Sequence, residues 1–368
     1  QTREQEVAYR GDQRLVKNFE PVPLEAVESS QLCFRERGVY LIVGGLGGVG
    51  IILGRHLAKT YKARLILTAR TWLPPRDQWP VLREKAKEPA DRQVAAVRAI
   101  LEMEKDGAEV MVIAVDVTDR AAMEEVVARA RQRYGPINGV IHCGYVADGA
   151  VIDQRTREAS EVVLAPKIKG TQVLDQVFRE KEPLEFFILC SSLAGIFGPI
   201  GQVAYTAGSA YQDAFAQHRR TYTSSYTHNI SIDWGDWAGT RAMEESVRNL
   251  AARLGIDPQA QLKDSMPQAD GIDAFNRVMV TTAAQVLVST REISTLLAHM
   301  NTYAAAPLFQ ESQARPESSG TRALMPRPLL KTPYIAPRSE AEKALAIVWQ
   351  NLFSLEAVGI GDDFFQLG

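Results

Sequence analysis

Short apolar runs recur along this chain and alternate with amphipathic helical segments. The runs "VYLIVG" at 39–44 and "FFILC" at 186–190 show little polar alternation. Strands of this kind are buried on both faces, as in a parallel sheet that helices cover on both sides. Strand and helix alternate at least six times along the chain. This pattern predicts an α/β fold with a doubly wound parallel sheet.

The apolar runs also place the expected elements along the chain. We expect helices at about 119–134 and 203–221, and a helical region that ends near residue 180. A charged stretch at about 76–107 has helical character as well. The expected strands lie at 39–44, 63–70, 108–119, 137–145, 184–192 and 229–237.

Composition argues against several classes of function. The net charge of the 368 residues is −2, so no basic surface indicates nucleic acid binding. No stretch approaches about 18 consecutive apolar residues, which argues against a membrane span. Cys33, Cys143 and Cys190 lack CxxC spacing, which favours a reducing cytoplasm over a disulfide framework. The five histidines never pair at metal-ligand spacing, so we expect no metal site.

Two regions depart from the alternation of strand and helix. Residues 1–38 have the character of short strand and loop, and residues 303–338 are rich in proline, alanine, serine and arginine, as in a linker. A new amphipathic helix follows, for which Ser339 is the expected N-cap and Glu342 completes a capping box. We therefore expect one large domain over 39–302 and a second domain that begins at Ser339.

A glycine-rich turn, "VGGLGGVG" at 43–50, joins the first buried strand to the first helix. Gly44, Gly48 and Gly50 take the places of a G-x-x-x-G-x-G pattern. Glycines at such positions let the backbone turn sharply and approach a pyrophosphate, whose charge then lies at a helix N-terminus. The alternative is a turn that serves packing alone, but its place between strand and helix favours dinucleotide binding.

The ends of the next two strands indicate which dinucleotide binds. An NAD site usually has an acidic residue at the end of the second strand, but this chain has Arg70 there and no carboxylate before Asp77. A cation at that position suits a 2′-phosphate, which favours NADPH over NADH. Asp116 ends the third strand, where a side chain can meet the adenine ring; its alternative role is a helix N-cap.

A serine and a tyrosine in the glycine-lined segment 191–211 point to chemistry. Ser192 ends an apolar strand, and Tyr205 opens the next helix thirteen residues later. Open α/β sheets bind ligands at the carboxyl ends of their strands, so both hydroxyls are expected at the mouth of the site. Because the pKa of an unperturbed tyrosine is about 10, proton transfer at neutral pH needs a nearby cation. Lys167 lies upstream on a helix and can supply that cation, whereas Lys169 is expected to face solvent.

Together these motifs resemble the ketoreductase domain of a modular polyketide synthase, or of a hybrid polyketide–peptide synthetase. Such domains belong to the short-chain dehydrogenase/reductase superfamily, which implies a Rossmann-type sheet. The resemblance covers about residues 39–300 as the catalytic domain. Residues 1–38 resemble the end of that family's structural subdomain, and residues 339–368, with "GDDFFQLG", resemble the opening of a carrier-protein domain.

The resemblance implies a catalytic set of lysine, serine, tyrosine and asparagine. Lys167, Ser192 and Tyr205 match the first three members. Four residues after the tyrosine, where the family usually has asparagine, this chain has Ser209. A serine is shorter but still donates and accepts hydrogen bonds, so it can support the lysine through a water. In such a set the tyrosine protonates the nascent alkoxide, the serine binds the carbonyl oxygen, and the lysine lowers the pKa of the phenol.

The same resemblance implies the residues that contact the cofactor. Trp234 and Gly235 match the family's stretch that closes over the nicotinamide, and Trp237 with residues 240–255 matches its lid helix. The loop "HCGY" at 142–145 replaces the more usual His-Ala-Ala-Gly. The expected cofactor contacts are Gly44, Gly45, Leu46, Gly47, Gly48, Val49, Gly50, Ala69, Arg70, Asp116, Val117, Cys143, Gly144, Tyr145, Lys167, Tyr205, Trp234 and Gly235.

The implied function is reduction of a β-ketoacyl thioester to a β-hydroxyacyl thioester with NADPH inside a megasynthase. The substrate is expected to arrive on the phosphopantetheine of a neighbouring carrier domain. Two alternatives stay open. The carrier-like segment resembles those of peptide synthetases at least as closely, which favours reduction of an α-ketoacyl group. Ser209 and the "HCGY" loop are also compatible with a catalytically silent scaffold domain.

Overall fold

A computed structural model gives the fold of the chain in two compact units, Gln1–Ile293 and Ser294–Gly368. The described residues are 7–28, 31–81, 92–148, 152, 155–179, 184–199, 201–223, 227–240, 265–297, 326–327, 330, 332–353 and 355–362.

The first unit is built on a seven-stranded sheet in the order β5-β4-β3-β6-β7-β8-β9, in which every neighbouring pair is parallel. This confirms the predicted doubly wound fold. The strand order reverses between β3 and β6, so their carboxyl ends form the switch point where such sheets bind ligands. The strands are β3 (Val39–Val43), β4 (Arg64–Ala69), β5 (Glu109–Ala114), β6 (Gly139–His142), β7 (Phe186–Ser192), β8 (His228–Trp234) and β9 (Gln285–Val288).

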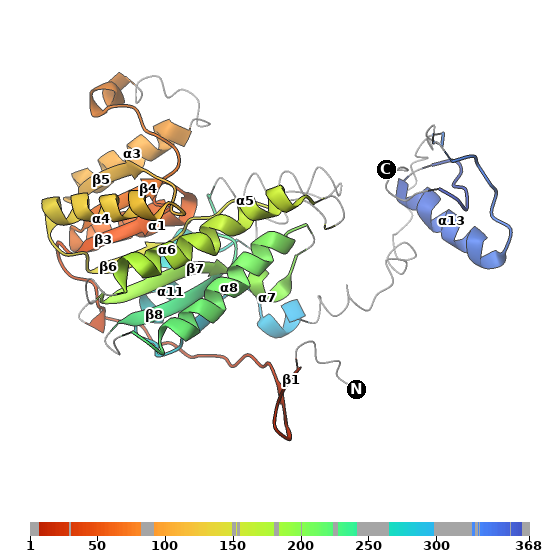
Figure 1. Ribbon diagram of the computed structural model, residues 1–368, viewed down its shortest axis with the longest axis horizontal. Helices are drawn as coiled ribbons and strands as arrows, with labels where there is room; N and C mark the ends of the chain where they lie inside the picture. The colour runs from red at the N-terminus through yellow and green to blue at the C-terminus, as the bar shows by residue number, and fades with distance from the viewer. Residues whose placement is uncertain are drawn as a thin grey trace. The chain divides into compact units, whose positions relative to one another are not determined.

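Helices cover both faces of this sheet (Figure 1). Side chains from α1, α3 and α11 join one apolar core, and side chains from α4, α6 and α8 join the other. The expected helices at 119–134 and 203–221 are confirmed as α4 and α8, whereas the expected helical region before residue 180 is two helices, α5 and α6. The helices are α1 (Gly48–Tyr61), α3 (Arg92–Lys105), α4 (Arg120–Tyr134), α5 (Arg157–Lys167), α6 (Lys169–Phe178), α7 (Ala194–Phe197), α8 (Val203–Arg219) and α11 (Gln268–Val278), with a 3₁₀ turn at Arg76–Gln78.

Strand β3 shows why the strands are apolar without alternation. All of its residues are buried. Tyr40 and Ile42 belong to the core on one face, and Leu41 and Val43 belong to the core on the other. Successive side chains of a strand point to opposite faces, so a strand between two helical layers needs apolar residues at every position.

A buried ion pair joins α6 to α8. Asp175 accepts a hydrogen bond of 2.9 Å from Nε of Arg219, and both side chains are at most 3% exposed. Arg179 also pairs with Asp175, and the guanidinium of Arg219 lies 4.2 Å from the ring centroid of Phe187 on β7. The pair therefore holds the C-terminal end of α8, the helix whose first turn contains Tyr205.

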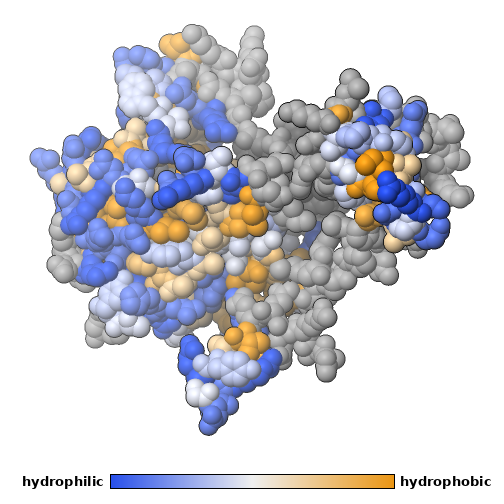
Figure 2. Space-filling model, turned by 45° about the vertical axis from the view of Figure 1, so that its right-hand side comes forward, coloured by the Kyte–Doolittle hydropathy of each residue, from blue (hydrophilic) through white to orange (hydrophobic). Residues whose placement is uncertain are grey.

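A two-stranded antiparallel hairpin, β1 (Val7–Arg10) and β2 (Gln13–Val16), lies near the N-terminus. This agrees with the expected strand and loop. Its side chains are all exposed, including Val7 and Tyr9, and Figure 2 shows apolar and polar surface side by side on it.

The second unit contains α13 (Glu340–Phe353), and the predicted capping box at its start is confirmed. Oγ of Ser339 accepts from the N–H of Glu342, and the Glu342 carboxylate accepts from the N–H of Ser339. Arg327 pairs with Asp362 at 2.8 Å, so part of the expected linker packs within this unit. In both units, no described helix has the length and apolar character needed to cross a membrane.

Replacing Asp175 by alanine is expected to lower the free energy of unfolding by about 3–5 kcal/mol, because the guanidinium of Arg219 then stays buried without its carboxylate. Urea denaturation measures the change. The matched control is Glu161→Ala, which breaks an exposed pair with Arg157 and should change the free energy by less than about 1 kcal/mol. Equal effects of the two substitutions would contradict a structural role of the buried pair.

Candidate active site

The glycine-rich turn lies between β3 and α1, as the sequence predicts. The N–H groups of Gly44 and Gly45 donate to the carbonyl of Thr68 at the end of β4, at 2.8 and 3.1 Å. Gly44 has a φ of +73°, a conformation that favours glycine. Leu46, Gly47, Gly48 and Val49 continue the turn into the first residues of α1.

The glycines of this turn let the backbone pack closely on itself and on the loop that follows β6. A Cβ on Gly44 would lie 2.8 Å from the backbone of Cys143, and a Cβ on Gly50 would lie 2.4 Å from the Gly44 carbonyl. Gly47, the N-cap of α1, provides no side-chain cap for the N–H groups of the first helical turn. Such unpaired N–H groups at a helix start suit the pyrophosphate of a dinucleotide. The residues present therefore fit a nicotinamide dinucleotide.

The neighbouring strand ends hold the residues expected to select the dinucleotide. Arg70 is exposed directly after β4, and Ala69 ends that strand. Asp116 accepts two hydrogen bonds of 2.8 Å from Thr118. Burial opposes ionisation of Asp116, but these bonds, with the charges of Arg70 and Lys169, outweigh burial and hold the pKa of Asp116 below its ordinary value.

Asp116 is not the N-cap of α4. Asp119 caps that helix instead, since its side chain accepts from the N–H of Ala122 at 3.1 Å. Asp116 closes a tight turn with Thr118, and Val117 beside it is buried. The alternative role of Asp116 as a helix N-cap is therefore wrong, and its carboxylate lies in the turn that follows β5.

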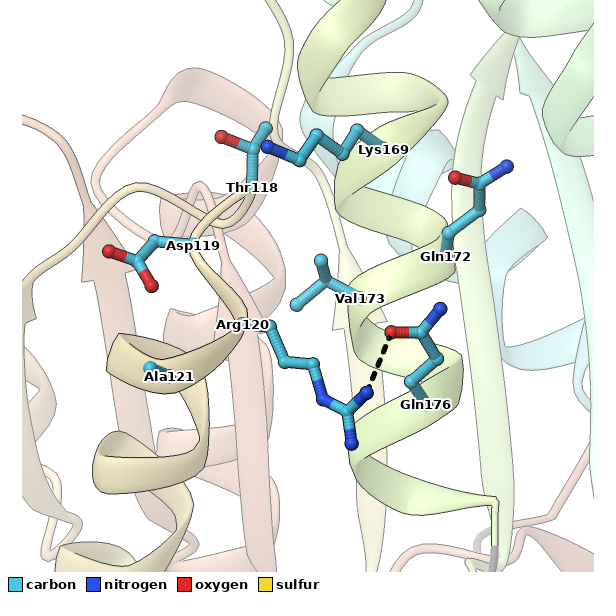
Figure 3. Close-up of a pocket in the computed structure, with 8 residues that line it drawn as sticks. All are labelled: Thr118, Asp119, Arg120, Ala121, Lys169, Gln172, Val173 and Gln176. Atoms are coloured by element: carbon cyan, nitrogen blue, oxygen red, sulfur yellow. Dashed lines mark hydrogen bonds between the residues drawn. The ribbon is translucent and has the colours of Figure 1, made fainter.

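A pocket of about 520 Å³ lies between the starts of α4 and α6 (Figure 3). Lys169 extends toward Thr118 across the pocket, and Arg120 donates to Gln176 at 3.4 Å. The pocket adjoins the turn that follows β5, and its lining contains neither Ser192 nor Tyr205. We therefore place the reaction site by the convergence of reactive side chains instead.

The loop that follows β6 is tied to the residue before Lys167. His142 is fully buried; its Nδ1 accepts from the N–H of Gly144 at 3.3 Å, and its Nε2 donates to the carbonyl of Pro166 at 2.9 Å. Burial lowers the pKa of His142 to about 4, so the ring is neutral at ordinary pH. Cys143, a free thiol, follows, with its Sγ 3.0 Å from that of Cys190.

Tyr205 lies in the first turn of α8, and Ser192 ends β7, as predicted. The ring of Tyr145, which is partly exposed, contacts the Tyr205 ring edge-on at a centroid distance of 5.8 Å. Burial raises the pKa of Tyr205, and a hydrogen bond with Ser192 acts in the opposite direction. The net direction is opposite to the lowering that the resemblance implies, because burial outweighs the hydrogen bond.

Lys167, the last residue of α5, is only 1% exposed and lies beside the tyrosine. Its Nζ is 5.0 Å from the centroid of the Tyr205 ring. Nζ donates to the carbonyl of Cys190 at 3.2 Å and to Oε1 of Gln212 at 2.8 Å. Burial lowers the pKa of Lys167 to about 8, although the carboxylate of Asp213 opposes this. The amine is therefore mostly charged at neutral pH.

The predicted support of Lys167 by Ser209 through a water stays a prediction. The Ser209 side chain is buried, and its Oγ has no direct hydrogen-bond partner within the part of the chain that the structure describes. Gln212, one turn further along α8, makes the direct hydrogen bond to the ammonium of Lys167. Sequence reasoning missed Gln212, because a single glutamine on a helix gives no local signal of burial.

Asp148 was also missed as a residue of the site. Its Oδ2 accepts from the N–H groups of Ala204 and Tyr205 at 3.1 and 3.2 Å, and its Oδ1 pairs with Arg155. Both side chains of the pair are at most 6% exposed. Gln202, the N-cap of α8, makes no side-chain cap, so Asp148 caps the helix from a loop 57 residues before Tyr205. A separation of this size leaves no sequence signal.

Trp234 ends β8 and packs edge-on against Trp237 at a centroid distance of 4.9 Å. Both indole side chains are buried. Gly235 follows, and its N–H donates to Val288 at the end of β9. The expected lid helix at 240–255 lies outside the described residues, apart from Thr240. These tryptophans are thus core residues at the same sheet edge.

The structure thus brings Lys167, Ser192 and Tyr205 together at the carboxyl edge of the sheet, beside the loop that follows β6. Within the described residues, no group of three or more histidine, cysteine or acidic side chains is placed to hold a metal ion. The arrangement can present a phenol, a hydroxyl and a buried cation to one carbonyl oxygen.

The arrangement is shared with a known family of protein domains. Residues 38–239 match the model of the KR domain. The chain belongs to the KR domain family. This match spans β3 to the turn after β8, which includes the glycine-rich turn and all three converging side chains.

Relatives of this KR domain are polyketide synthases. It is 36% identical over 267 residues to a subunit of the phenolphthiocerol/phthiocerol polyketide synthase from Mycobacterium tuberculosis, covering 71% of this chain and 14% of the relative. It is 35% identical over 243 residues to polyketide synthase PksL of Bacillus subtilis, covering 64% of this chain and 5% of the relative. The chain therefore spans a small part of these multidomain proteins.

A solved structure agrees with this assignment. The crystal structure of a ketoreductase domain from the bacillaene assembly line superimposes with a TM-score of 0.64 at 26% identity, covering 81% of this chain and 65% of that chain. This KR domain is thus a ketoreductase domain of the polyketide synthase kind, whose fold implies a nicotinamide cofactor.

Replacing Asp148 by alanine is expected to speed hydrogen exchange at the amides of Ala204 and Tyr205, which lose their acceptor. Loss of the cap, together with loss of the carboxylate that pairs with the buried Arg155, is expected to lower the free energy of unfolding by about 3–5 kcal/mol. Amide exchange followed by NMR or mass spectrometry measures the effect. Asp148→Asn is the matched control, since it keeps an acceptor oxygen and should protect both amides better than alanine does. Unchanged exchange at both amides in the alanine variant would contradict the capping role.

Proposed function

We propose that this KR domain reduces a β-ketoacyl thioester, carried on phosphopantetheine, to a β-hydroxyacyl thioester, with NADPH as the reductant. The observation that carries the proposal is the convergence of Tyr205, Ser192 and the buried Lys167 beside a glycine turn that fits a dinucleotide. The polyketide synthase relatives support a thioester substrate. The alternative of a silent scaffold is an outcome of the test below.

Each of the three side chains has a distinct role in this proposal. NADPH, when bound, supplies hydride to the carbonyl carbon. Ser192 donates a hydrogen bond to the carbonyl oxygen, and Tyr205 donates its proton as that oxygen becomes an alkoxide. Lys167 stabilises the phenolate that remains, since its ammonium lies over the tyrosine ring and its two hydrogen-bond acceptors among the described residues are neutral.

The raised pKa of Tyr205 is compatible with this role. Burial keeps the phenol protonated throughout the neutral range, so the proton is present when the carbonyl binds. An alkoxide is a stronger base than a phenolate, so the proton still moves downhill once the alkoxide forms. The nearby ammonium is needed for the phenolate product, because an ionised phenol in a buried place is costly without a cation.

The preference for NADPH is assigned to Arg70. Its exposed guanidinium at the end of β4 replaces the acidic residue of an NAD site and suits a 2′-phosphate. Asp116 and Val117, at the end of the next strand, are then placed to border the adenine.

We also propose that residues 339–368 begin a carrier domain of a polyketide or hybrid synthase, and that residues 1–38, 39–302 and 303–338 are a structural-subdomain end, the catalytic domain and a linker. The capping box of α13 supports an ordered unit after the linker, and the pairing of Arg327 with Asp362 joins the later part of the linker to that unit. The three free cysteines accord with a reducing compartment such as the cytoplasm.

Tyr205→Phe is expected to lower kcat by about 10²–10⁴-fold, because it removes the proton donor and leaves the ring in place. Oxidation of NADPH with a 3-oxoacyl pantetheine thioester measures the rate. Tyr211→Phe is the matched control on the same helix, since its hydroxyl bonds Gln172 on the surface.

Parental turnover in the Tyr205→Phe variant would contradict the proposed mechanism. A parental domain that consumes no thioester would favour the silent scaffold. A competition between 2-oxoacyl and 3-oxoacyl thioesters tests the α-ketoacyl alternative, for which the proposal predicts preference for the 3-oxoacyl substrate.

Arg70→Ala is expected to raise KM for NADPH about tenfold and to leave KM for NADH nearly unchanged, because a charge-assisted contact to the 2′-phosphate is lost. Steady-state kinetics with each cofactor measures the ratio. Arg129→Ala, on α4, is the control for loss of charge alone. An unaltered ratio of the two KM values in the Arg70 variant would contradict the assignment.

A further inference from the structure

We propose that Gln212 is the positioning residue that holds the ammonium of Lys167, in the role that the resemblance gives to an asparagine at position 209. The proposal rests on the function proposed above and assigns to that same site a residue outside the expected catalytic set.

The hydrogen bonds around Gln212 form a closed circuit. Its Oε1 accepts from Nζ of Lys167 at 2.8 Å, and its Nε2 donates to Oγ1 of Thr171 at 3.3 Å. Oγ1 of Thr171 donates in turn to the backbone carbonyl of Lys167 at 2.6 Å. The amide orientation follows from this circuit, because an ammonium only donates and the oxygen must face it. All three side chains are at most 1% exposed.

The path of the lysine side chain explains why residue 212 is reached and residue 209 is not. A Cβ on Gly208 would lie 3.1 Å from Cβ and 3.2 Å from Cδ of Lys167, so the lysine stem lies against the bare backbone of α8 at this glycine. Residue 212 is one helical turn beyond Gly208 and lies on the same face. Oγ of the short Ser209 has no hydrogen-bond partner among the described residues, while the longer side chain of Gln212 meets the ammonium.

The acceptors of the ammonium are neutral, and this matters for the reaction. Nζ bonds the Cys190 carbonyl and the Gln212 amide oxygen, so neither of these partners neutralises its charge. The carboxylate of Asp213, the next residue, accepts from Oγ of Ser231 at 2.7 Å, and its charge raises the pKa of Lys167. The ammonium lies 5.0 Å from the centroid of the Tyr205 ring, so its charge acts on that ring.

Loss of the Gln212 contact should also move the titration of Lys167. A hydrogen bond to the charged form favours that form, so removing it lowers the pKa of Lys167 further below its present value of about 8. The alkaline fall in activity then begins at lower pH. The titratable groups that act on or adjoin Lys167 are Asp213 and Tyr205 on α8, Cys190 on β7, Asp233 on β8, and His142 and Cys143 at the end of β6.

The test compares Gln212→Leu with the double variant Ser209→Asn/Gln212→Leu. The single variant is expected to lower kcat about tenfold or more with little change in KM, and to shift the alkaline limb of the pH profile to lower pH. The double variant, which restores an amide at the usual position, is expected to recover most of the loss. Gln217→Leu, an exposed glutamine on the same helix, is the matched control and should behave as the parent.

Parental kcat and an unshifted pH profile in folded Gln212→Leu would overturn the proposal, as would failure of the double variant to recover activity. If leucine prevents folding, Gln212→Met keeps the length of the side chain and carries the same expectations. An NMR titration of the lysine side chain in Gln212→Met is independent of turnover, and an unchanged pKa of Lys167 there would also overturn the proposal. If the parental domain reduces no thioester, the proposed function is contradicted but this proposal is not. The NMR titration of Lys167 then decides the role of Gln212.

Discussion

The buried ammonium of Lys167 is the constraint around which this domain is arranged. An amine this deep in the fold is costly to charge, which is why its pKa falls to about 8. The pKa of Lys167 is lower in the folded protein than its ordinary value of 10.5, so protonation of this amine disfavours the folded state. This loss of stability is complete below about pH 8, where the amine is charged in the folded protein as well. Two neutral oxygens and the face of the Tyr205 ring surround it. The fold thus holds a cation close enough to the Tyr205 ring to stabilise negative charge on its phenol oxygen.

Three elements meet to make that arrangement. Helix α5 ends at Lys167, β7 ends at Ser192, and α8 begins just before Tyr205. The parallel sheet brings these ends to one edge, and Asp148 supplies the cap that α8 lacks locally. The glycine turn after β3 leads at the same edge into the start of α1, where Gly47 provides no side-chain cap for the first N–H groups.

Much of this was predictable because it is encoded locally. Unbroken apolar strands predicted the parallel sheet, and the turn at 43–50 and the spacing of Ser192 and Tyr205 predicted the site. Contacts whose partners lie far apart in the chain were not predictable. Ser209 was predicted to support Lys167 through a water, whereas the direct contact of the lysine with Gln212, reached along its path over α8, was missed. Nothing local shows which face of a helix meets a lysine 45 residues earlier.

Lys167→Met tests the central claim most directly, because methionine nearly matches the lysine stem and carries no charge. The account predicts that NADPH oxidation with a 3-oxoacyl thioester falls at least about 100-fold, while the free energy of unfolding is not lowered, since a buried charge has been removed. A folded Lys167→Met domain that reduces the thioester at the parental rate would contradict the account.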